Sequence, residues 1–348
     1  MTALVVGADV GGTSTRVAVA SLDGTVLALA RGGPGNPNSV GLAASAAEIR
    51  AVTERALAAV DRSAADGAGV DRAAVERSGV ERAEVDEAVT AVVIGLAGGS
   101  RAAADPGFLR SAVPETVAAL PTLVSDLTVA FCSATPEARG SVLVAGTGAV
   151  SGRVVGADLV EQRDGWGWLL GDEGSGFWIG RAAVRAALAD LQLGRPPGPL
   201  VVAVLTQARA ESYLDLLQTC YAEPPAWLAR FSPLVSRHAG QDPAAAAIAH
   251  QAAGQLEALL TGLSLVPGEP VVLAGSVLTS DGPVQSLLRE RLRSRGLGPV
   301  LSPASGVTGA LWIALRGCGV QGSDVHVRLV QTTRRRLDGQ EAAEKYAR

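Results

Sequence analysis

Lysine is almost absent from this chain of 348 residues, because Lys345 is the only one and arginine supplies the remaining positive charge. A Walker-type phosphate loop, a protein-kinase site and a pyridoxal Schiff base each need a lysine inside the fold. Since Lys345 lies in a charged C-terminal stretch, the sequence excludes these three kinds of site. The formal net charge of −4 provides no basic field, so we expect no nucleic-acid partner.

Cysteine and histidine are also scarce, with three residues of each. Cys132, Cys220 and Cys318 lie far apart, a spacing that suits neither zinc nor an iron–sulfur cluster. They are expected to be reduced thiols, as in a cytoplasmic protein. No apolar run reaches the length of a membrane span, and the first residues run into a strand pattern without a secretion signal. We therefore expect a cytoplasmic protein without a membrane partner.

The segment from Gly165 to Gly176, GWGWLLGDEGSG, combines glycines, two tryptophans and two adjacent carboxylates. Glycine loses much backbone entropy on folding, so such a run indicates a backbone that approaches a ligand closely. Aromatic rings cover the C–H surfaces of a sugar, and carboxylates accept hydrogen bonds from its hydroxyl groups. A flexible surface loop is the alternative, but the tryptophans favour a sugar-binding segment.

A glycine-rich turn separates two apolar, β-branched runs near the start of the chain, Leu4–Ala8 and Arg16–Ala20. The backbone N–H groups and hydroxyl groups of such a turn can surround phosphate oxygens without a lysine. Asp9, at the end of the first strand, is positioned to hold a hydrated Mg²⁺ against those phosphates. An ordinary hairpin is the alternative, although it would not need Asp9. The candidate phosphate-binding residues are Gly11, Gly12 and Thr13, with the hydroxyl groups of Thr13, Ser14 and Thr15 as donors.

The pattern of strand, glycine turn and strand recurs at 141–155, with a threonine in each turn and an Arg-Val pair after it. Two copies in a chain of this length predict a duplicated α/β domain with a cleft between the copies. We expect domains at 1–121 and 122–330, a low-complexity insertion at about 61–88, and a charged, frayed tail at 331–348.

The second turn contains Gly146, Thr147 and Gly148. It is close to a dinucleotide-binding fingerprint, but no long helix follows and no acidic residue lies at the required distance. A second phosphate-binding turn fits better. A last strand, Val271–Ala274, ends in Gly275 and Ser276, where bare backbone can carry an adenine or ribose.

Asp126 follows a short predicted strand, Thr122–Val124, and lies between the two turns in the sequence. A lone aspartate after a strand is commonly a turn former or a helix cap. Its position between two phosphate-binding turns makes Asp126 a candidate base.

Taken together, these residues resemble the N-acetylglucosamine kinase and BadF/BadG-type ATPase family, within the actin-like, hexokinase-type ATPases. The resemblance covers about residues 4–320. It rests on Asp9 to Thr13, Asn36 within GNPNS, Ser125-Asp126, Gly146 to Gly148, Gly165 to Gly176, and Leu273 to Val277.

The resemblance implies an α/β fold of two ribonuclease-H-like domains, with ATP and Mg²⁺ in the interdomain cleft. It also implies an ATP-dependent kinase that phosphorylates the 6-hydroxyl of N-acetylglucosamine or a related amino sugar, and a homodimer. In the family's kinases an aspartate at the position of Asp126 is the base that faces this hydroxyl. The implied ATP-binding residues are Gly11, Gly12, Thr13, Gly146, Thr147, Gly148, Gly275 and Ser276, with the metal near Asp9. The implied sugar contacts are Asn36, Asp126, Gly165, Trp166, Gly167 and Asp172.

Two positions depart from the family pattern and leave the sugar open. Ala97 replaces a small polar residue beside Gly98-Gly99, and Arg163 replaces a cysteine ahead of Gly-Trp-Gly. Glucosamine, N-acetylmuramic acid and glucose remain alternative substrates. An activator-type ATPase with a protein partner is a further alternative, but it needs closely placed cysteines for an iron–sulfur cluster. A sugar-sensing regulator would carry a helix-turn-helix ahead of the first strand, for which the strand starting at Leu4 is expected to leave no room.

Overall fold

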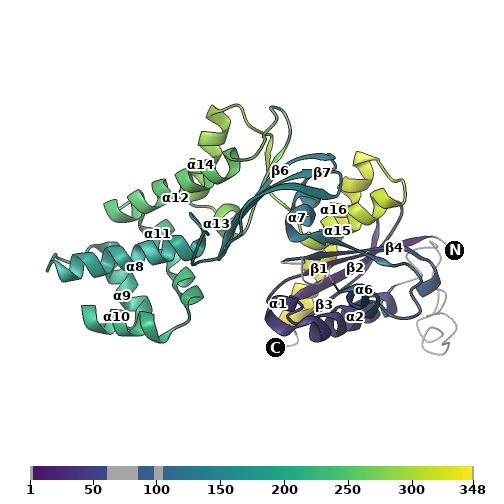
Figure 1. The fold of residues 1–348 in the computed structure, drawn as a ribbon, viewed down its shortest axis with the longest axis horizontal. Coiled ribbons are helices and arrows are strands. Elements are labelled where there is room, and N and C mark those ends of the chain that lie inside the picture. Colours follow the sequence, from purple (N-terminus) through teal and green to yellow (C-terminus); the bar gives the residue numbers. More distant parts are fainter. Residues whose placement is uncertain (1–2, 61–84, 98–104, 347–348) are drawn as a thin grey trace. The chain divides into compact units, whose positions relative to one another are not determined.

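The computed structural model describes residues 3–60, 85–97 and 105–346 (Figure 1). Most of the expected insertion at 61–88, and the pair Gly98-Gly99, lie outside the described residues. The chain divides into two compact units: unit 1 is Met1–Ala138, Gly156–Asp158 and Pro303–Arg348, and unit 2 is Arg139–Val155 and Leu159–Ser302. This division differs from the expected boundary near residue 121, because one more strand and helix belong to unit 1 and the chain returns to it after Ser302.

Unit 1 is built on a mixed sheet of five strands in the order β3-β2-β1-β4-β5. β2 is antiparallel to β1 and β3, whereas β4 is parallel to β1 and β5. The strands are β1 (Leu4–Val10), β2 (Thr15–Ser21), β3 (Val26–Gly32), β4 (Val89–Leu96) and β5 (Pro121–Ser125). β1, β2 and β4 are buried along most of their length, as expected for strands covered by helices on both faces.

Helices cover both faces of this sheet (Figure 1). On one face α2 packs on β2 and β3, and its Ile49 and Val52 share a buried core with Val17 and Val19 of β2. On the other face α15 packs on β1 and β4, and it also packs against α7. The helices of unit 1 include α1 (Pro37–Val40), α2 (Leu42–Ala58), α6 (Pro106–Ser111), α7 (Asp126–Ala134), α15 (Gly306–Gly317) and α16 (Ser323–Tyr346).

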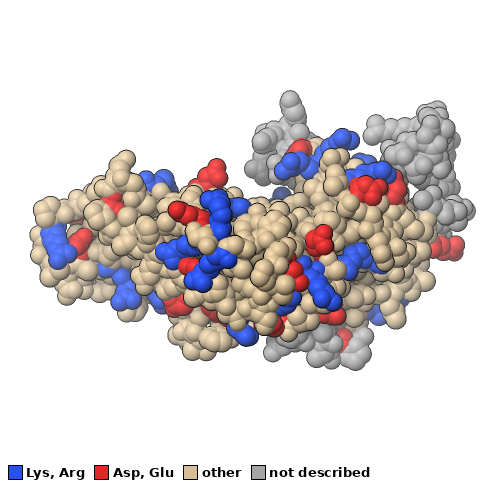
Figure 2. Space-filling view, turned by 90° about the horizontal axis from the view of Figure 1, so that it is seen from above, with Lys and Arg blue, Asp and Glu red and all other residues tan. Residues whose placement is uncertain are grey.

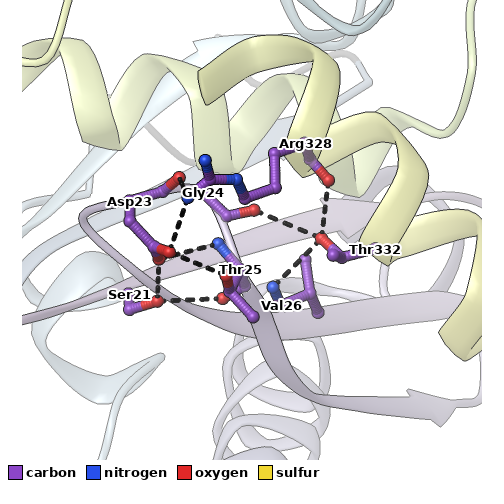
Figure 3. Close-up of polar contacts among 7 residues, drawn as sticks. All are labelled: Ser21, Asp23, Gly24, Thr25, Val26, Arg328 and Thr332. Carbon is purple, nitrogen blue, oxygen red and sulfur yellow. Dashed lines mark hydrogen bonds and ion pairs between the residues drawn. The ribbon is translucent and has the colours of Figure 1, made fainter. Parts of the chain in front are cut away.

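The stretch predicted to fray from about Thr332 is helical instead, because α16 packs on the β2–β3 hairpin. Figure 3 shows the contact: Thr332 Oγ1 accepts a hydrogen bond from the Val26 N–H at 3.1 Å, and Arg328 pairs with Asp23 at 2.8 Å. Farther along the helix, Gln340 Nε2 donates to the carbonyl oxygen of Leu29 at 2.7 Å. The prediction of a frayed tail is therefore wrong for the residues up to Gln340.

Unit 2 repeats the sheet of unit 1, in the order β8-β7-β6-β9-β10. β7 is antiparallel to β6, whereas β9 is parallel to β6 and β10. The strands are β6 (Arg139–Ala145), β7 (Ala149–Val155), β8 (Asp158–Asp164), β9 (Val271–Ala274) and β10 (Val300–Leu301). The two sheets have the same strand order and the same directions around their first hairpin, so the predicted duplication is confirmed at the level of topology.

Between β8 and β9 the chain of unit 2 is mostly helical, as the alanine- and leucine-rich sequence predicts. Prolines at the first turns of α9, α12 and α14 begin these helices, because proline lacks only an N–H that has no partner there. α8 and α12 contribute much of the buried core. The helices are α8 (Gly176–Gln192), α9 (Pro199–Ala208), α10 (Tyr213–Ala222), η2 (Pro225–Phe231), α11 (Ser232–His238), α12 (Pro243–Thr261), α13 (Ser276–Thr279) and α14 (Pro283–Ser294).

The charged side chains are mixed in sign on the face that Figure 2 presents, where arginines lie beside aspartates and glutamates. Oppositely charged side chains also form ion pairs, such as Glu257 with Arg291 at 3.0 Å and with Arg295 at 2.6 Å. Within the described part of the chain, every helix is too short or too polar to cross a membrane.

Candidate functional site

In unit 1 the candidate residues gather at the carboxyl ends of the parallel strands. Val10 of β1 pairs with Leu96 of β4, which pairs with Ser125 of β5, so the three strands end level with one another. Asp9 lies one residue before this edge on β1, and Asp126, the first residue of α7, directly follows the end of β5. Only β4 lies between β1 and β5 in the sheet. Neighbouring strands are about 4.8 Å apart, so the backbones of Asp9 and Asp126 lie near each other at this edge. Ligands of open α/β sheets commonly bind at this edge.

Asp9 is a partly buried carboxylate. Burial raises its pKa above the ordinary value, the positive charge of Arg16 on the paired strand lowers it, and the charge of Asp126 raises it again. Its carboxylate also lies against Gly306, the first residue of α15. The N–H groups at a helix start favour negative charge, so α15 helps to keep a buried carboxylate at this position.

Asp126 is the first residue of α7, with Ser125 as the N-cap. Its Oδ1 accepts from the Leu127 N–H at 3.0 Å and from the Ser125 hydroxyl at 3.2 Å. Burial raises the pKa of Asp126, while these hydrogen bonds lower it. Asp126 Oδ2 makes no hydrogen bond to the described residues, so this oxygen is available to a ligand.

The first glycine turn is exposed at Gly12 and Thr13. The Gly11 N–H donates to the carbonyl oxygen of Ser14 at 3.0 Å, so it is occupied within the turn. Thr15 is fully buried and its hydroxyl has no partner within the described part of the chain. The sequence interpretation that Thr15 donates to phosphate is therefore wrong, because its side chain faces the protein interior, whereas Gly12 and Thr13 stay accessible.

Asn36 connects the first turn to β4. Its Oδ1 accepts from the Asn38 N–H at 2.8 Å and caps α1, and its Nδ2 donates to the carbonyl oxygen of Ala97 at 3.1 Å. The backbone N–H of Asn36 donates to the carbonyl oxygen of Gly11 at 3.1 Å. An asparagine amide has two donor hydrogens and an acceptor with two lone pairs, so Asn36 retains capacity for a sugar hydroxyl.

In unit 2 the second glycine turn is fixed by the start of α8. Gly176 N–H donates to the Gly146 carbonyl oxygen at 2.7 Å, and Phe177 N–H donates to the Thr147 carbonyl oxygen at 3.1 Å. Gly275 packs directly on this turn, since a Cβ atom at Gly275 would lie 2.8 Å from the Gly146 nitrogen. With a φ of 84°, Gly275 also occupies a conformation that favours glycine. The structure thus places Gly275, at the end of β9, directly beside the second glycine turn.

The loop between β8 and α8 exposes large apolar side chains. Trp166 is 71% exposed and Trp168 is 45% exposed, and Leu169 and Leu170 are also exposed. Trp168 packs against Phe177 of α8 with ring centroids 5.8 Å apart. A ring exposed on a loop of fixed backbone is the arrangement that stacks on an apolar face of a sugar.

Asp172 is only 8% exposed and points back at the second turn. Its Oδ1 accepts from the Ala149 N–H at 2.9 Å, next to Gly148. Burial raises the pKa of Asp172, the bond from Ala149 lowers it, and the charge of Asp164 raises it. Asp172 therefore joins the tryptophan loop to the second turn, a connection that its spacing in the sequence does not reveal.

The sequence interpretation missed two residues of these sites, Asp164 and Gly306. Asp164 accepts hydrogen bonds from the backbone of the tryptophan loop, and Gly306 lies against Asp9. An Asp-Gly pair at 164–165 is a turn signal that could have drawn attention to Asp164. Gly306 carries no such signal, because its contact with Asp9 spans most of the chain.

The carboxylates of unit 1 fit a divalent cation held largely by phosphate and water. Mg²⁺ commonly takes one or two carboxylates and several waters beside substrate phosphates. Asp9 and Asp126 provide two interacting carboxylates at one sheet edge. Among the described residues, three or more histidine, cysteine or acidic side chains do not converge on one point, so a closed metal cage is not formed there.

Two sheets of this topology in one chain define the class of fold, that of the actin-like ATPases and the related sugar kinases. The model of the BadF/BadG/BcrA/BcrD ATPase family matches residues 6–314, and the chain belongs to this family.

Similar proteins include sugar kinases by name. The N-acetylmuramic acid/N-acetylglucosamine kinase of Clostridium acetobutylicum is 25% identical over 222 residues, which make up 62% of this chain and 64% of that protein. The match thus spans slightly less than two thirds of the length of this curated relative.

Solved structures share the fold over nearly the whole chain. A protein of Chromobacterium violaceum named as a candidate N-acetylglucosamine kinase matches with a TM-score of 0.66 and 26% identity, covering 90% of this chain and 99% of that one. The ROK hexokinase of Thermus thermophilus matches with a TM-score of 0.50 and 18% identity, covering 90% of this chain and 97% of that one. The second match is a likeness of fold alone.

Proposed function

We propose that this protein is an ATP-dependent sugar kinase that phosphorylates the 6-hydroxyl of N-acetylglucosamine or a closely related amino sugar. The observation that carries the proposal is Asp126, a partly buried carboxylate with a free Oδ2 that lies beside Asp9 at the carboxyl edge of the unit 1 sheet. Membership of an ATPase family and the names of the similar proteins support the same reaction class.

Asp126 is the proposed general base. Its Oδ1 is held by the Leu127 N–H and the Ser125 hydroxyl, which fixes the carboxylate plane and leaves Oδ2 to accept the proton of the sugar 6-hydroxyl. The oxygen then attacks the γ-phosphorus of ATP, the bond to the β-phosphate oxygen breaks, and ADP leaves. Phosphoryl transfer depends mainly on positioning and charge neutralisation, so one oriented carboxylate is sufficient for the proton transfer.

In the proposal, main-chain N–H groups bind the phosphate oxygens that a lysine binds in other phosphate sites. In the proposal, the turn residues Gly11, Gly12, Thr13, Gly146, Thr147 and Gly148 bind the phosphates, and Gly275 and Ser276 lie under the nucleoside. Asp9 would hold Mg²⁺, which when bound neutralises phosphate charge. Accessible N–H and hydroxyl groups of small residues suit this task, because they allow the backbone to approach phosphate oxygens closely.

The sugar would lie against the loop that carries the two exposed tryptophans. Trp166, between Gly165 and Gly167, offers an apolar ring for the C–H face of the sugar. Asn36 would bind a hydroxyl through its remaining amide capacity, and Asp172 would support the loop or accept a hydroxyl through its second oxygen. We further propose that the protein is cytoplasmic and forms a homodimer, in line with the family pattern.

A panel of sugars tests the proposal. Purified protein, ATP and Mg²⁺ are combined with N-acetylglucosamine, N-acetylmuramic acid, glucosamine or glucose, and ADP release is measured. ³¹P–¹H coupling in the product identifies the phosphorylated oxygen. We expect the highest kcat/KM for N-acetylglucosamine and coupling to the C6 protons. ADP release that no sugar stimulates would overturn the kinase proposal.

The activator-type ATPase has less support from the structure. Cys132 is fully buried, and burial raises the pKa of its thiol to about 12, which makes it a poor ligand for iron. All three cysteines are free. Iron analysis of the purified protein separates the two functions, since the activator type requires stoichiometric iron and the sugar kinase requires none.

A further inference from the structure

Two aspartates of the tryptophan loop adopt a backbone conformation that is unfavourable for them. Among the described residues, three that are not glycine have a positive φ: Asp164 at 60°, Asp172 at 61° and Arg209 at 54°. The left-handed region costs an L-residue on the order of 1 kcal/mol. Residues held in this region often mark functional sites, and two of these three are within one loop.

The carboxylate of Asp164 binds the backbone of this loop from inside. Its Oδ1 accepts from the Trp166 N–H at 3.2 Å, and its two oxygens accept from the Asp172 N–H at 3.2 Å and 3.0 Å. Gly171 lies so close to Asp164 that a side chain there would collide with the carboxylate. One side chain therefore closes the loop by holding residues near its two ends.

The contacts continue from Asp164 to the second glycine turn. Asp172, whose N–H binds Asp164, accepts from the Ala149 N–H at 2.9 Å through its own carboxylate. The Gly165 N–H donates to the carbonyl oxygen of the same Ala149 at 3.2 Å. Ala149 directly follows Gly148, where a Cβ atom would lie 2.6 Å from Asp172 Oδ1. Both ends of the loop are thus attached to Ala149, which follows the turn. One attachment is made by Gly165, next to Asp164 in the chain, and the other by Asp172, whose N–H binds the Asp164 carboxylate.

We propose that Asp164 is a positioning residue that sets Trp166 and Asp172 at a fixed place relative to the Gly146–Gly148 turn, and so orients the sugar toward the phosphate. This inference rests on the proposed kinase function for the identity of the ligand. Glycine would adopt a φ of 60° with less strain than aspartate. The property that aspartate adds at this position is its carboxylate, which accepts hydrogen bonds from two loop amides.

The Gly146–Gly148 turn is held by hydrogen bonds from α8 that do not depend on Asp164. The inference therefore predicts an effect on sugar binding and none on ATP binding. Gly146 and Thr147 accept from Gly176 and Phe177 at the start of α8, and these bonds do not involve Asp164. Loss of the Asp164 carboxylate should therefore disturb the sugar loop and leave the nucleotide turn in place. The expected result is a change in the sugar KM that the ATP KM does not share.

Two substitutions at this position separate the carboxylate from the backbone conformation. Asp164→Gly keeps the positive φ and removes the acceptors, and we expect the sugar KM to rise between about 10- and 100-fold, as for misplaced binding groups. The ATP KM should stay within about threefold of the wild-type value, because the turn is held by α8. Asp164→Asn keeps an acceptor oxygen and tolerates the left-handed region, so its sugar KM should lie within about fivefold of wild type.

Arg209→Gly is the matched control, because Arg209 has a similar φ of 54° at the exposed end of α9 and lies outside the loop. Its kinetic constants should equal those of the wild type. A sugar KM of Asp164→Gly equal to the wild-type value would overturn the inference. It would also be overturned if Asp164→Asn were as impaired as Asp164→Gly, or if the ATP KM rose together with the sugar KM.

Hydrogen exchange tests the same link without any reaction. In Asp164→Gly the amides of Trp166 and Asp172 should lose protection, while the amides of Gly176 and Phe177 keep theirs. Unchanged protection at Trp166 and Asp172 would overturn the structural part of the inference. If the wild-type protein phosphorylates no sugar while Asp164→Gly still shows this exchange pattern, the proposed function is refuted and the structural part of the inference stands, so the two failures are distinguishable.

Discussion

The carboxylate of Asp9 lies directly against Gly306, so that a Cβ atom on Gly306 would be 2.5 Å from Asp9 Oδ2 and 2.7 Å from Oδ1. Asp9 belongs to β1 and Gly306 begins α15, so the contact joins the first strand of the chain to one of its last helices. A glycine at the helix start leaves room for this carboxylate, which occupies the space that a Cβ atom would need. Any larger residue would move either the helix or the carboxylate.

Gly306→Ala should therefore impair the enzyme even though alanine is a better helix former than glycine. We expect kcat with the preferred sugar to fall about 10- to 100-fold and the Mg²⁺ concentration for half-maximal rate to rise, since Asp9 is displaced. Gly317→Ala in the same helix is the control, because nothing lies within 4 Å of a Cβ atom there. Equal activity of the two variants would show that the Asp9 contact does not matter for the reaction.

Asp126→Asn should abolish most of the phosphoryl transfer without abolishing ATP binding. The amide keeps the hydrogen-bond geometry of Oδ1 but cannot take a proton, so kcat should fall by roughly 10²–10⁴. Asp105→Asn, at the N-cap of α6, is the matched control because asparagine caps a helix as well as aspartate does. Calorimetric titration with ATP measures the binding that should persist. Near-normal phosphorylation by Asp126→Asn would remove the assigned role.

The same substitution should stabilise the protein at neutral pH. Burial raises the pKa of Asp126 above the ordinary value of 3.8, so the folded state binds this proton more tightly than the unfolded state does. Ionisation of Asp126 therefore lowers stability as the pH rises through its folded-state pKa, and the penalty is absent below pH 3.8. We expect Asp126→Asn to raise the melting temperature at pH 7 and to have little effect well below pH 4. A lower melting temperature at pH 7 would contradict this account.

The contacts of α16 with the β2–β3 hairpin allow two kinds of polar contact to be compared (Figure 3). Arg328 and Asp23 form an ion pair with about half of each side chain exposed, and such pairs contribute about 0–1 kcal/mol. Thr332 accepts from the N–H of Val26, a residue only 2% exposed, and an unsatisfied buried donor costs about 1–3 kcal/mol. Thr332→Val should therefore lower the free energy of unfolding more than Arg328→Ala. Denaturant melts of both variants measure the difference, and the reverse order would refute the argument.

Much of the fold could be predicted because the sequence repeats its own signals. The turns after β1 and β6 each combine two glycines with a threonine between apolar, β-branched strands, and the structure confirms a duplicated sheet. Local patterns also predicted the strand at Val271–Ala274. The C-terminal helix was missed because its sequence is rich in charged residues, and tertiary contacts, such as Gln340 with Leu29, explain its position.

The sequence proposes which residues of each unit could form a site, but it does not predict how these residues contact one another. Strand ends and glycine turns are common places for ligands in such sheets, so the sequence proposes Asp9, Asp126 and Gly146 as candidates. The orientation of Thr15 and the link from Asp164 to Asp172 depend on side-chain directions and on a left-handed backbone, which no local pattern specifies.

The helix α15 covers β1 and β4 of unit 1, yet it follows the whole of unit 2 in the chain. During synthesis the ribosome must therefore release all of unit 2 before the apolar surface of β1 and β4 can be covered. Unit 2, whose segments lie between Arg139 and Ser302, is complete earlier and can begin to fold first. We therefore expect the apolar face of β1 and β4 to remain uncovered during synthesis until α15 has been made.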